Sequence, residues 1–194
     1  MIRKNQSPKL KGALIMAKMA IFYGSTSGMT QEVATKLHEH FGEELCDIYS
    51  MEEDFMSVDE MLEYDYLLFG CSTWGSGEVQ NDWRDPLFEM DMDKPDFTGK
   101  TIALFGTGDY ASHGEQFVSA LGTLYDHFKK LGATLVGEFS TDGYTYDYSF
   151  AERDGKFVGL PIDEVNESEK TDERIARWLE VIAPHFSSAS LETA

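Results

Sequence analysis

Hydroxyl side chains and glycines gather in residues 24–30, which read Gly-Ser-Thr-Ser-Gly-Met-Thr and precede a stretch with helical apolar spacing. The N-terminus of a helix leaves backbone N–H groups free and favours negative charge, so hydroxyls placed there suit a phosphate. An ordinary serine or threonine helix cap is the alternative interpretation. The segment contains no lysine or arginine and neither the GxxxxGK[ST] nor the GxGxxG pattern. We therefore expect a single terminal phosphate, and not a nucleoside triphosphate or a dinucleotide.

Two further segments carry polar and aromatic side chains in a glycine-rich setting. Residues 72–83 place Trp74 among glycines, and residues 107–115 begin Thr-Gly-Asp. A lone loop tryptophan is more often simple packing, but its glycine-rich setting at a strand end favours a functional role for Trp74. His113 lies in the third segment, where an ordinary solvated loop histidine is one interpretation.

Alternating apolar and amphipathic stretches predict the elements that position these segments. Short apolar runs predict buried parallel strands at 19–23, 45–49, 65–70, 100–106 and 134–139. Helical spacing predicts helices at 30–41, 57–62, 82–90, 115–131 and 171–186. We expect Ser57 to cap the second, Pro86 to limit the third, and Thr171 or Asp172 to cap the last. The pattern predicts an α/β fold with ligands bound beyond the carboxyl ends of the strands.

Composition points to one folded, acidic domain. The 194 residues are 42% hydrophobic and carry a net charge of −19. Residues 1–18 contain five basic side chains and no acid, so residues 19–194 carry 11 basic and 35 acidic side chains, a net charge of −24. Such a domain repels nucleic acid and anionic lipid and is steered towards basic proteins, although acidity also serves solubility alone.

The cysteines and the N-terminal residues indicate in which cellular compartment the protein is expected. Cys46 and Cys71 lie in apolar runs without ligand spacing, which predicts buried thiols and neither a disulfide nor a metal site. Residues 1–17 loosely imitate a signal peptide, but Lys18 interrupts the apolar stretch and cleavage there would remove a strand. We expect residues 1–17 to be a disordered extension that could lie upstream of a true start at Met16. The domain then spans 18–187, with a flexible tail at 188–194, in a cytoplasmic protein that does not enter a membrane.

Residues 21–30, Ile-Phe-Tyr-Gly-Ser-Thr-Ser-Gly-Met-Thr, followed by Ala34 and Leu37, resemble the FMN phosphate-binding signature of the flavodoxin family. The similarity extends over residues 18–186, and residues 140–165 resemble the insertion that splits the last strand of long-chain flavodoxins. The resemblance implies a three-layer, flavodoxin-like α/β sandwich with a five-stranded parallel sheet in the order 2-1-3-4-5. It implies a low-potential one-electron carrier that binds FMN non-covalently and is not an enzyme.

Two other functions compete with the carrier. An FMN-dependent NAD(P)H:quinone reductase of the same fold needs space for a nicotinamide, whereas Trp74 is expected to cover one face of the flavin. A phospho-acceptor regulator of similar topology needs acidic residues at the end of the first strand, where this chain has Gly24, Ser25 and Thr26. The carrier is therefore favoured over both.

The resemblance also assigns roles to residues. Trp74 stacks on one flavin face, the Gly75–Ser76 peptide turns over on one-electron reduction, and the backbone of residues 107–109 bonds the pyrimidine edge. The family usually has a tyrosine four residues after the aspartate, where this chain has His113, so either His113 or Tyr110 covers the outer face. The expected FMN contacts are Ser25, Thr26, Ser27, Gly28, Met29, Thr30, Ser72, Thr73, Trp74, Gly75, Ser76, Gly77, Thr107, Gly108, Asp109, Tyr110, His113 and Gln116.

The expected partners are basic redox proteins. The resemblance implies a ferredoxin/flavodoxin NADP reductase on one side and acceptor oxidoreductases on the other, contacted transiently by a monomer. Four carboxylates should lie near the flavin edge and lower its reduction potential: Glu78, Asp82, Asp85 and Asp109. Together with Asp91 and Asp93, they should flank that edge and face the basic partner.

Overall fold

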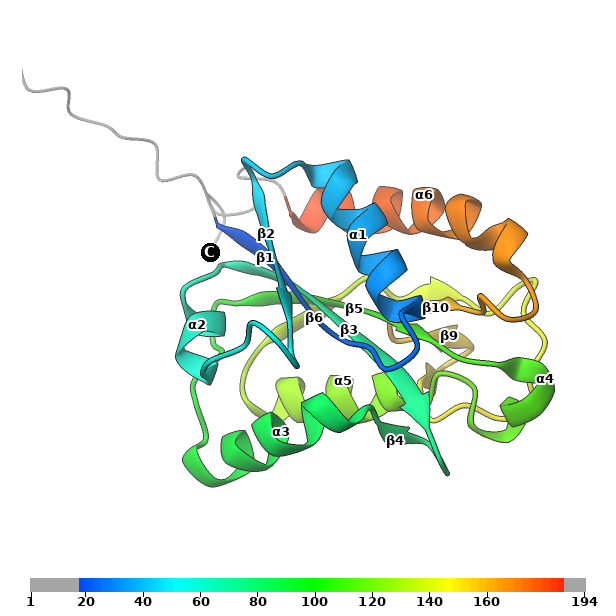
Figure 1. Ribbon diagram of the computed structural model, residues 1–194, viewed down its shortest axis with the longest axis horizontal. Helices are drawn as coiled ribbons and strands as arrows, with labels where there is room; N and C mark the ends of the chain where they lie inside the picture. Colours follow the sequence, from blue (N-terminus) through cyan, green and yellow to red (C-terminus); the bar gives the residue numbers. More distant parts are fainter. Residues whose placement is uncertain (1–17, 187–194) are drawn as a thin grey trace, which may run out of the picture.

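A twisted parallel sheet runs through the centre of the computed structural model, which describes residues 18–186 (Figure 1). The expectations for residues 1–17 and 188–194 lie outside this range. Four strands lie side by side in the order β2 (Cys46–Ser50), which is at the edge, β1 (Met19–Gly24), β3 (Tyr66–Trp74) and β5 (Thr101–Thr107). All are parallel to their neighbours.

Two short strands share the fifth position of the sheet. β6 (Thr134–Val136) pairs with the first half of β5, and β10 (Leu160–Ile162) pairs with its second half. The segment between them contains a small antiparallel sheet of β7 (Phe139–Ser140), β8 (Glu152–Arg153) and β9 (Lys156–Phe157). The predicted five-position sheet and its order are confirmed, with the last strand split by the insertion.

Helices cover both faces of the sheet, as predicted. Figure 1 shows α1 (Met29–Phe41) and α6 (Thr171–Ile182) on one face, and α3 (Asn81–Asp93) and α5 (Ala120–Lys130) on the other. Shorter pieces complete the structure: α2 (Val58–Leu62), β4 (Glu78–Val79), α4 (Tyr110–His113), and 3₁₀ turns at Gly114–Gln116, Ser168–Lys170 and Ala183–His185. No helix of the described chain is long and apolar enough to cross a membrane.

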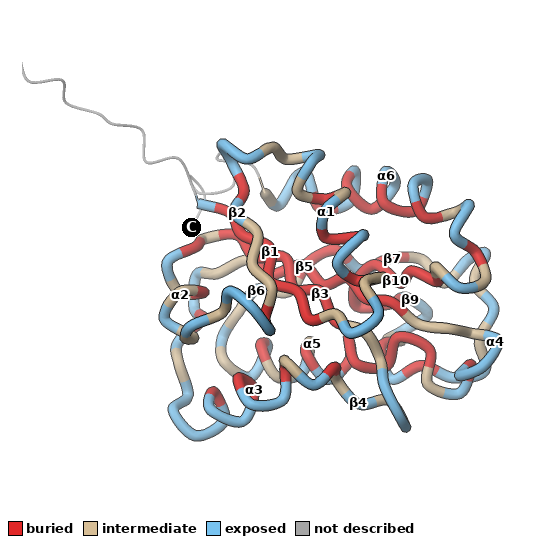
Figure 2. The backbone as a smooth tube through the Cα atoms, viewed as in Figure 1, coloured by how far each residue is buried: buried red, intermediate tan, exposed pale blue. Residues whose placement is uncertain are grey.

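The alternation of side chains along each strand builds two cores. In β1, Phe22 contributes to a cluster with Trp83 of α3 and Phe128 of α5, whereas Ile21 contributes to one with Leu37 of α1 and Trp178 of α6. Figure 2 shows the buried backbone concentrated in the central strands. Because both faces are covered, β1 and the buried parts of β3 and β5 are continuously apolar in sequence, whereas the edge strand β2 includes exposed Asp47.

Several predicted boundaries were wrong for local reasons. α3 continues to Asp93 through Pro86, because Trp83 and Met90 are buried on either side of the proline. α5 begins at Ala120, not at residue 115, after a turn in which Val118 has φ 46°. The strand from residue 134 ends at Val136, because Gly137 (φ 87°) turns the chain out of the sheet.

Of the predicted helix caps, the position of Ser57 is confirmed and the cap of the last helix is wrong. Ser57 occupies the N-cap position of α2 but makes no capping hydrogen bond, and Glu60 accepts instead from the N–H of Met56 (3.0 Å). Neither Thr171 nor Asp172 caps α6, whose N-cap is Lys170. The Thr171 hydroxyl donates to Glu164 (2.6 Å), a contact that sequence spacing does not encode.

Candidate cofactor site

A pocket of about 230 Å³ opens where β1, β3 and β5 end. The three segments singled out by the sequence meet there, although they are far apart along the chain. Of the expected contacts, the pocket is lined by Ser27, Met29, Ser72, Thr73, Trp74, Gly75, Thr107, Gly108, Asp109, His113 and Gln116. The others belong to the same loops but do not line it: Ser25, Thr26, Gly28, Thr30, Ser76, Gly77 and Tyr110.

The first loop delivers the N-terminus of α1 to the pocket. Gly28 is the N-cap, in the left-handed conformation (φ 87°), and its N–H donates to the Ser25 hydroxyl (3.1 Å). Glu32 N–H donates to Gly28 C=O (2.9 Å), so the first intrahelical bond begins there. The amides of residues 29–31 precede that bond and have no carbonyl one turn earlier to accept them. Thr26 and Ser27 are exposed beside these amides.

A buried hydrogen bond joins the first loop to the third. The hydroxyls of Thr30 and Thr107 lie 2.9 Å apart, and Thr30 is fully buried. Because the Thr30 hydroxyl is committed to Thr107, its backbone N–H is the group left for a ligand. Thr107 lines the pocket while serving the same link.

Gln80, which the sequence did not single out, joins the first loop to the second. Its side chain is buried and donates to the Thr26 hydroxyl (3.2 Å) and to the Asp82 carboxylate (2.6 Å). Its amide oxygen accepts the N–H of Asp82 (2.9 Å), which caps α3. The position of a glutamine just before a helix could have suggested the cap. Its contact with Thr26, 54 residues away, leaves no sequence signal.

The second loop holds an indole in a fixed but accessible position. Trp74 is 47% exposed, and its Nε1 donates to the Ser72 hydroxyl (2.9 Å). The turn beyond it closes with Gly77 N–H donating to Trp74 C=O (3.0 Å), and both Gly75 (φ 54°) and Gly77 (φ 105°) are left-handed. Thr73 accepts the N–H of Ala120 (3.1 Å), so this loop also fixes the start of α5.

The third loop is organised around Asp109. Its carboxylate accepts the N–H groups of Ala111 (3.1 Å) and Ser112 (2.9 Å), which caps α4, and the side-chain amide of Asn166 (2.9 Å). Partial burial works against the ionised form, but the hydrogen bonds from Asn166 and Ser112 outweigh it and hold the pKa of Asp109 below its ordinary value. Asp109 therefore anchors a turn and contributes negative charge at the pocket.

The two candidates for the outer face of a ring occupy different places. His113 is exposed and lines both the pocket and an adjacent recess, whereas Tyr110 packs against the core and lines the recess but not the pocket. Phe117 and Val165 also line the pocket and were not anticipated. Val165 comes from the loop after β10, where an isolated apolar residue among acids carries no sequence signal.

The lining fits a phosphorylated, flat heterocycle. Hydroxyls and free amides are available for the phosphate, and Trp74, Phe117 and Val165 supply apolar surface for the ring. A Cβ at Gly108 would lie 2.9 Å from the Phe117 ring, so glycine there permits close packing. No lysine or arginine lines the pocket of the described chain. Within residues 18–186 no cluster of potential metal ligands was found, and burial raises the pKa of the Cys46 and Cys71 thiols to about 12.

Comparison with known proteins gives consistent matches. The family model described as "Flavodoxin" matches residues 21–178. The chain is 70% identical over 174 residues to Flavodoxin 1 of Azotobacter vinelandii, covering 90% of this chain and 100% of that protein. It is 41% identical over 172 residues to a flavodoxin of Picosynechococcus, covering 88% and 99%. A Fusobacterium nucleatum flavodoxin structure bound to flavin mononucleotide matches with a TM-score of 0.81 at 30% identity, covering 89% and 100%.

Proposed function

Because the chain belongs to the flavodoxin family, whose members are electron carriers and not enzymes, we propose that the pocket beyond β1, β3 and β5 is its FMN site. The observation that carries this proposal is the meeting of the α1 N-terminus, the Trp74 indole and the Asp109 turn in one pocket, which no lysine or arginine of residues 18–186 lines. Bound FMN supplies the electron chemistry, because a flavin accepts and releases electrons one at a time. The quinone reductase alternative is not favoured by the comparisons.

The phosphate end of FMN is assigned to the first loop. The Thr26 and Ser27 hydroxyls are exposed beside the first amides of α1, and Gln80 holds Thr26 in place. A helix N-terminus stabilises a nearby negative charge by about 0.3–1 kcal/mol at an exposed site, and the amides add direct hydrogen bonds. Because no described residue that lines the site is a lysine or arginine, the site suits a phosphate monoester that arrives without magnesium.

The ring end of FMN is assigned to the second and third loops. Trp74 is placed against one face, and His113, which lines the pocket, is preferred to Tyr110 for the other. The backbone of residues 107–109 is the proposed partner of the polar ring edge. Carboxylates nearby disfavour the negative charge that full reduction adds. One carboxylate about 10 Å away contributes roughly 1.7 kcal/mol at an effective dielectric constant near 20, which corresponds to about 70 mV.

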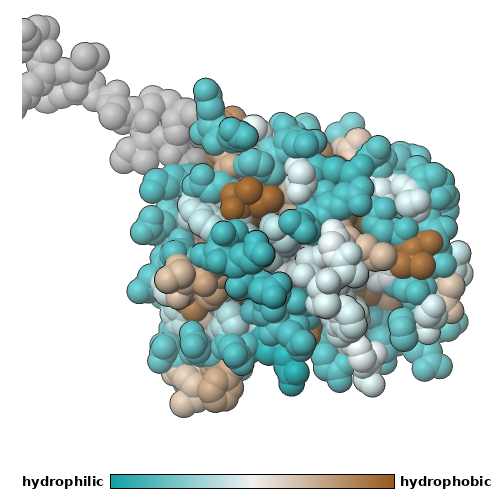
Figure 3. All heavy atoms as spheres, viewed as in Figure 1, coloured by the Kyte–Doolittle hydropathy of each residue, from teal (hydrophilic) through white to brown (hydrophobic). Residues whose placement is uncertain are grey.

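We assign partner docking to the acidic surface beside the pocket, and the partners to basic redox proteins such as a ferredoxin/flavodoxin NADP reductase and acceptor oxidoreductases. The face of the molecule seen in Figure 3 is largely hydrophilic, with isolated apolar spots. The six carboxylates expected to dock are not equivalent: Asp82 accepts from Gln80, and Asp91 contacts Lys130 (3.3 Å). Asp85 is exposed on α3, one turn after Asp82, and is therefore the docking candidate chosen for the test.

A monomeric, cytoplasmic carrier is the setting we propose. Two buried, unpaired cysteines suit a reducing compartment, and the strongly acidic composition opposes self-association and binding to nucleic acid or anionic lipid. Gel filtration over a range of salt concentrations tests the oligomeric state directly.

The FMN site is tested by calorimetric titration of the FMN-free full chain with FMN and with riboflavin, which lacks the phosphate. We expect both to bind, FMN more tightly by at least about tenfold because of the first loop. A chain that takes up no FMN contradicts the proposal. The reductase alternative is tested by mixing the FMN-loaded protein with NADPH and a quinone without any added reductase, and we expect no turnover.

A further inference from the structure

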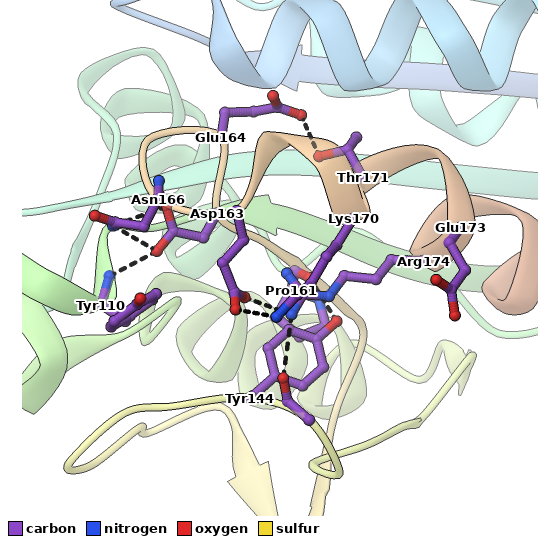
Figure 4. A network of polar contacts seen from close by, with 12 residues as sticks. Tyr110, Tyr144, Pro161, Asp163, Glu164, Asn166, Lys170, Thr171, Glu173 and Arg174 are labelled. Carbon is purple, nitrogen blue, oxygen red and sulfur yellow. Dashed lines mark hydrogen bonds and ion pairs between the residues drawn. The ribbon is translucent and has the colours of Figure 1, made fainter.

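A fourth loop, residues 163–167, packs against the third cofactor loop (Figure 4). Asp163 is fully buried, and its carboxylate accepts the backbone N–H groups of Tyr110 (2.9 Å), Val165 (3.0 Å) and Asn166 (2.9 Å). The chain beside it is held as well, because Gly108 N–H donates to Ile162 C=O (2.9 Å). One buried carboxylate thus fixes both its own turn and the backbone that follows Asp109.

The side-chain amide of Asn166 lies between two carboxylates. Its Nδ2 donates to Asp109 Oδ1 (2.9 Å) and to both oxygens of Asp163 (2.9 and 3.1 Å). Ionised carboxylates only accept hydrogen bonds, so an amide donor is what this position requires. Without it, two negative charges would face each other in a partly buried setting, where their repulsion is poorly screened. Asn166 therefore couples the fourth loop to the third.

The far end of the fourth loop is fixed to α6 and to the insertion. The Glu167 carboxylate is ion-paired with Arg174 (2.5 Å) and with Lys170. The Arg174 guanidinium lies over the Tyr144 ring at 4.0 Å, and the Tyr144 hydroxyl donates to Pro161 C=O (2.8 Å). The position of Asn166 is consequently determined by the fold and not by the ligand.

We propose that Asn166, supported by Asp163, is a positioning residue for bound FMN: it holds the Asp109–Tyr110 backbone in the form that receives the flavin ring. The same turn presents Val165, which is 53% exposed yet lines the pocket, as apolar wall for that ring. The inference rests on the proposed FMN site. A loop that is ordered before binding loses less conformational entropy when the ligand arrives, so releasing it weakens affinity.

The test compares flavin binding by the FMN-free full chain carrying Asn166→Ala with binding by the wild type. We expect the Kd values of FMN and riboflavin to rise by the same factor, about tenfold, because the ring loop is loosened while the phosphate loop is untouched. Asn81→Ala is the matched control, since Asn81 is exposed at the start of α3 and makes one long contact to Arg84 (3.5 Å). Its Kd values should stay within about twofold of the wild type.

A readout independent of flavin is available in the same proteins. Loss of the Asn166 donor should raise the pKa of Asp109, measured by NMR titration, and speed hydrogen exchange at Tyr110 N–H. If Asn166→Ala does not fold, Asn166→Ser, which keeps one shorter donor, should still raise both Kd values by about threefold.

Unchanged Kd values in Asn166→Ala, with tight FMN binding by the wild type, overturn the positioning role while leaving the FMN site intact. A rise in the Kd of FMN but not of riboflavin overturns it as well. A wild type that binds neither flavin overturns the FMN site itself.

Discussion

The hydrogen bond between Thr30 and Thr107 permits a quantitative test of how the site is assembled. The two hydroxyls lie 2.9 Å apart, with Thr30 at 0% and Thr107 at 4% exposure, and they join the first turn of α1 to the end of β5. Replacing either threonine by valine keeps the shape and removes the hydroxyl. A buried hydroxyl left without its partner loses solvation without compensation. We therefore expect either single variant to lower the free energy of unfolding of the FMN-free protein by about 1–3 kcal/mol.

The double variant Thr30→Val/Thr107→Val should lose much less than the sum of the single losses. Removing both polar groups leaves neither unsatisfied, so the coupling free energy should be about 1–2 kcal/mol. Urea unfolding, followed by far-UV circular dichroism, measures the free energy of unfolding of each variant. In thermal unfolding, a loss of about 1 kcal/mol corresponds to a decrease of roughly 2–4 °C in Tm for a domain of this size.

Thr35→Val is the matched control, because Thr35 is exposed on α1 and bonds only its own helix at Gln31 C=O (2.9 Å). Its free energy of unfolding should change by less than about 0.5 kcal/mol. Additive losses in the double variant would show that the two hydroxyls do not interact, and the reasoning that links the first and third loops would fail.

Three further measurements probe other parts of the site. Trp74→Ala should weaken the binding of FMN and of riboflavin alike by about ten- to hundredfold in a fluorescence titration, because ring stacking is lost. Trp74→Phe should retain most of the affinity. Unchanged binding by Trp74→Ala would show that the indole does not contact the flavin. Asp85→Lys should slow reduction by a ferredoxin/flavodoxin NADP reductase several-fold at low salt, with the difference shrinking as salt rises, while Glu44→Lys, at the opposite end of the sheet, should not. Equal rates for the two would contradict docking at α3. At Glu167, burial opposes ionisation, but hydrogen bonds from Lys170 and Arg174 lower its pKa below 4.5. The stability that this carboxylate contributes is present above the unfolded-state pKa of about 4.5 and is lost as the pH falls through the lower pKa of the folded state. The difference in free energy of unfolding between wild type and Glu167→Gln should therefore be full at pH 7 and shrink below about pH 4.5. A gap independent of pH would refute the assignment.

The sheet could be predicted from the sequence because its central strands are buried on both faces. Tyr66–Phe69 and Ile102–Phe105 are apolar without interruption for this reason, and the amphipathic stretches between such runs had to be the covering helices. Boundaries failed where distant contacts decide them. α5 begins at Ala120 because Thr73 of another loop accepts its N–H, and no periodicity within residues 115–131 reports that contact.

The site was predictable to the extent that its chemistry is local. The hydroxyl loop and the glycine-flanked Trp74 are contiguous in sequence, and their residue types indicate phosphate and ring binding without reference to the rest of the chain. Gln80 and Asn166 were missed because each contacts a residue far away in the sequence. Gln80 bonds to Thr26, 54 residues away, and Asn166 bonds to Asp109, 57 residues away. A lone amide side chain has no spacing that distinguishes such a role from ordinary solvent exposure.

The polar side chains of the three loops mostly hold the loops together, and within residues 18–186 none of the residues that line the pocket is a lysine or arginine. Ser25, Thr30 and Thr73 each bond to backbone or to another hydroxyl within the protein, and Asp109 bonds three donors. Backbone amides, the indole and a few exposed hydroxyls are then left to meet the ligand. Such groups can hold a phosphate and a neutral ring firmly while offering little to the extra negative charge of full reduction. A rigid pocket whose charged lining residue is Asp109 therefore favours tight binding together with a low reduction potential. Introducing a cation beside Trp74 would therefore raise the potential more than it raises the affinity of the oxidised cofactor.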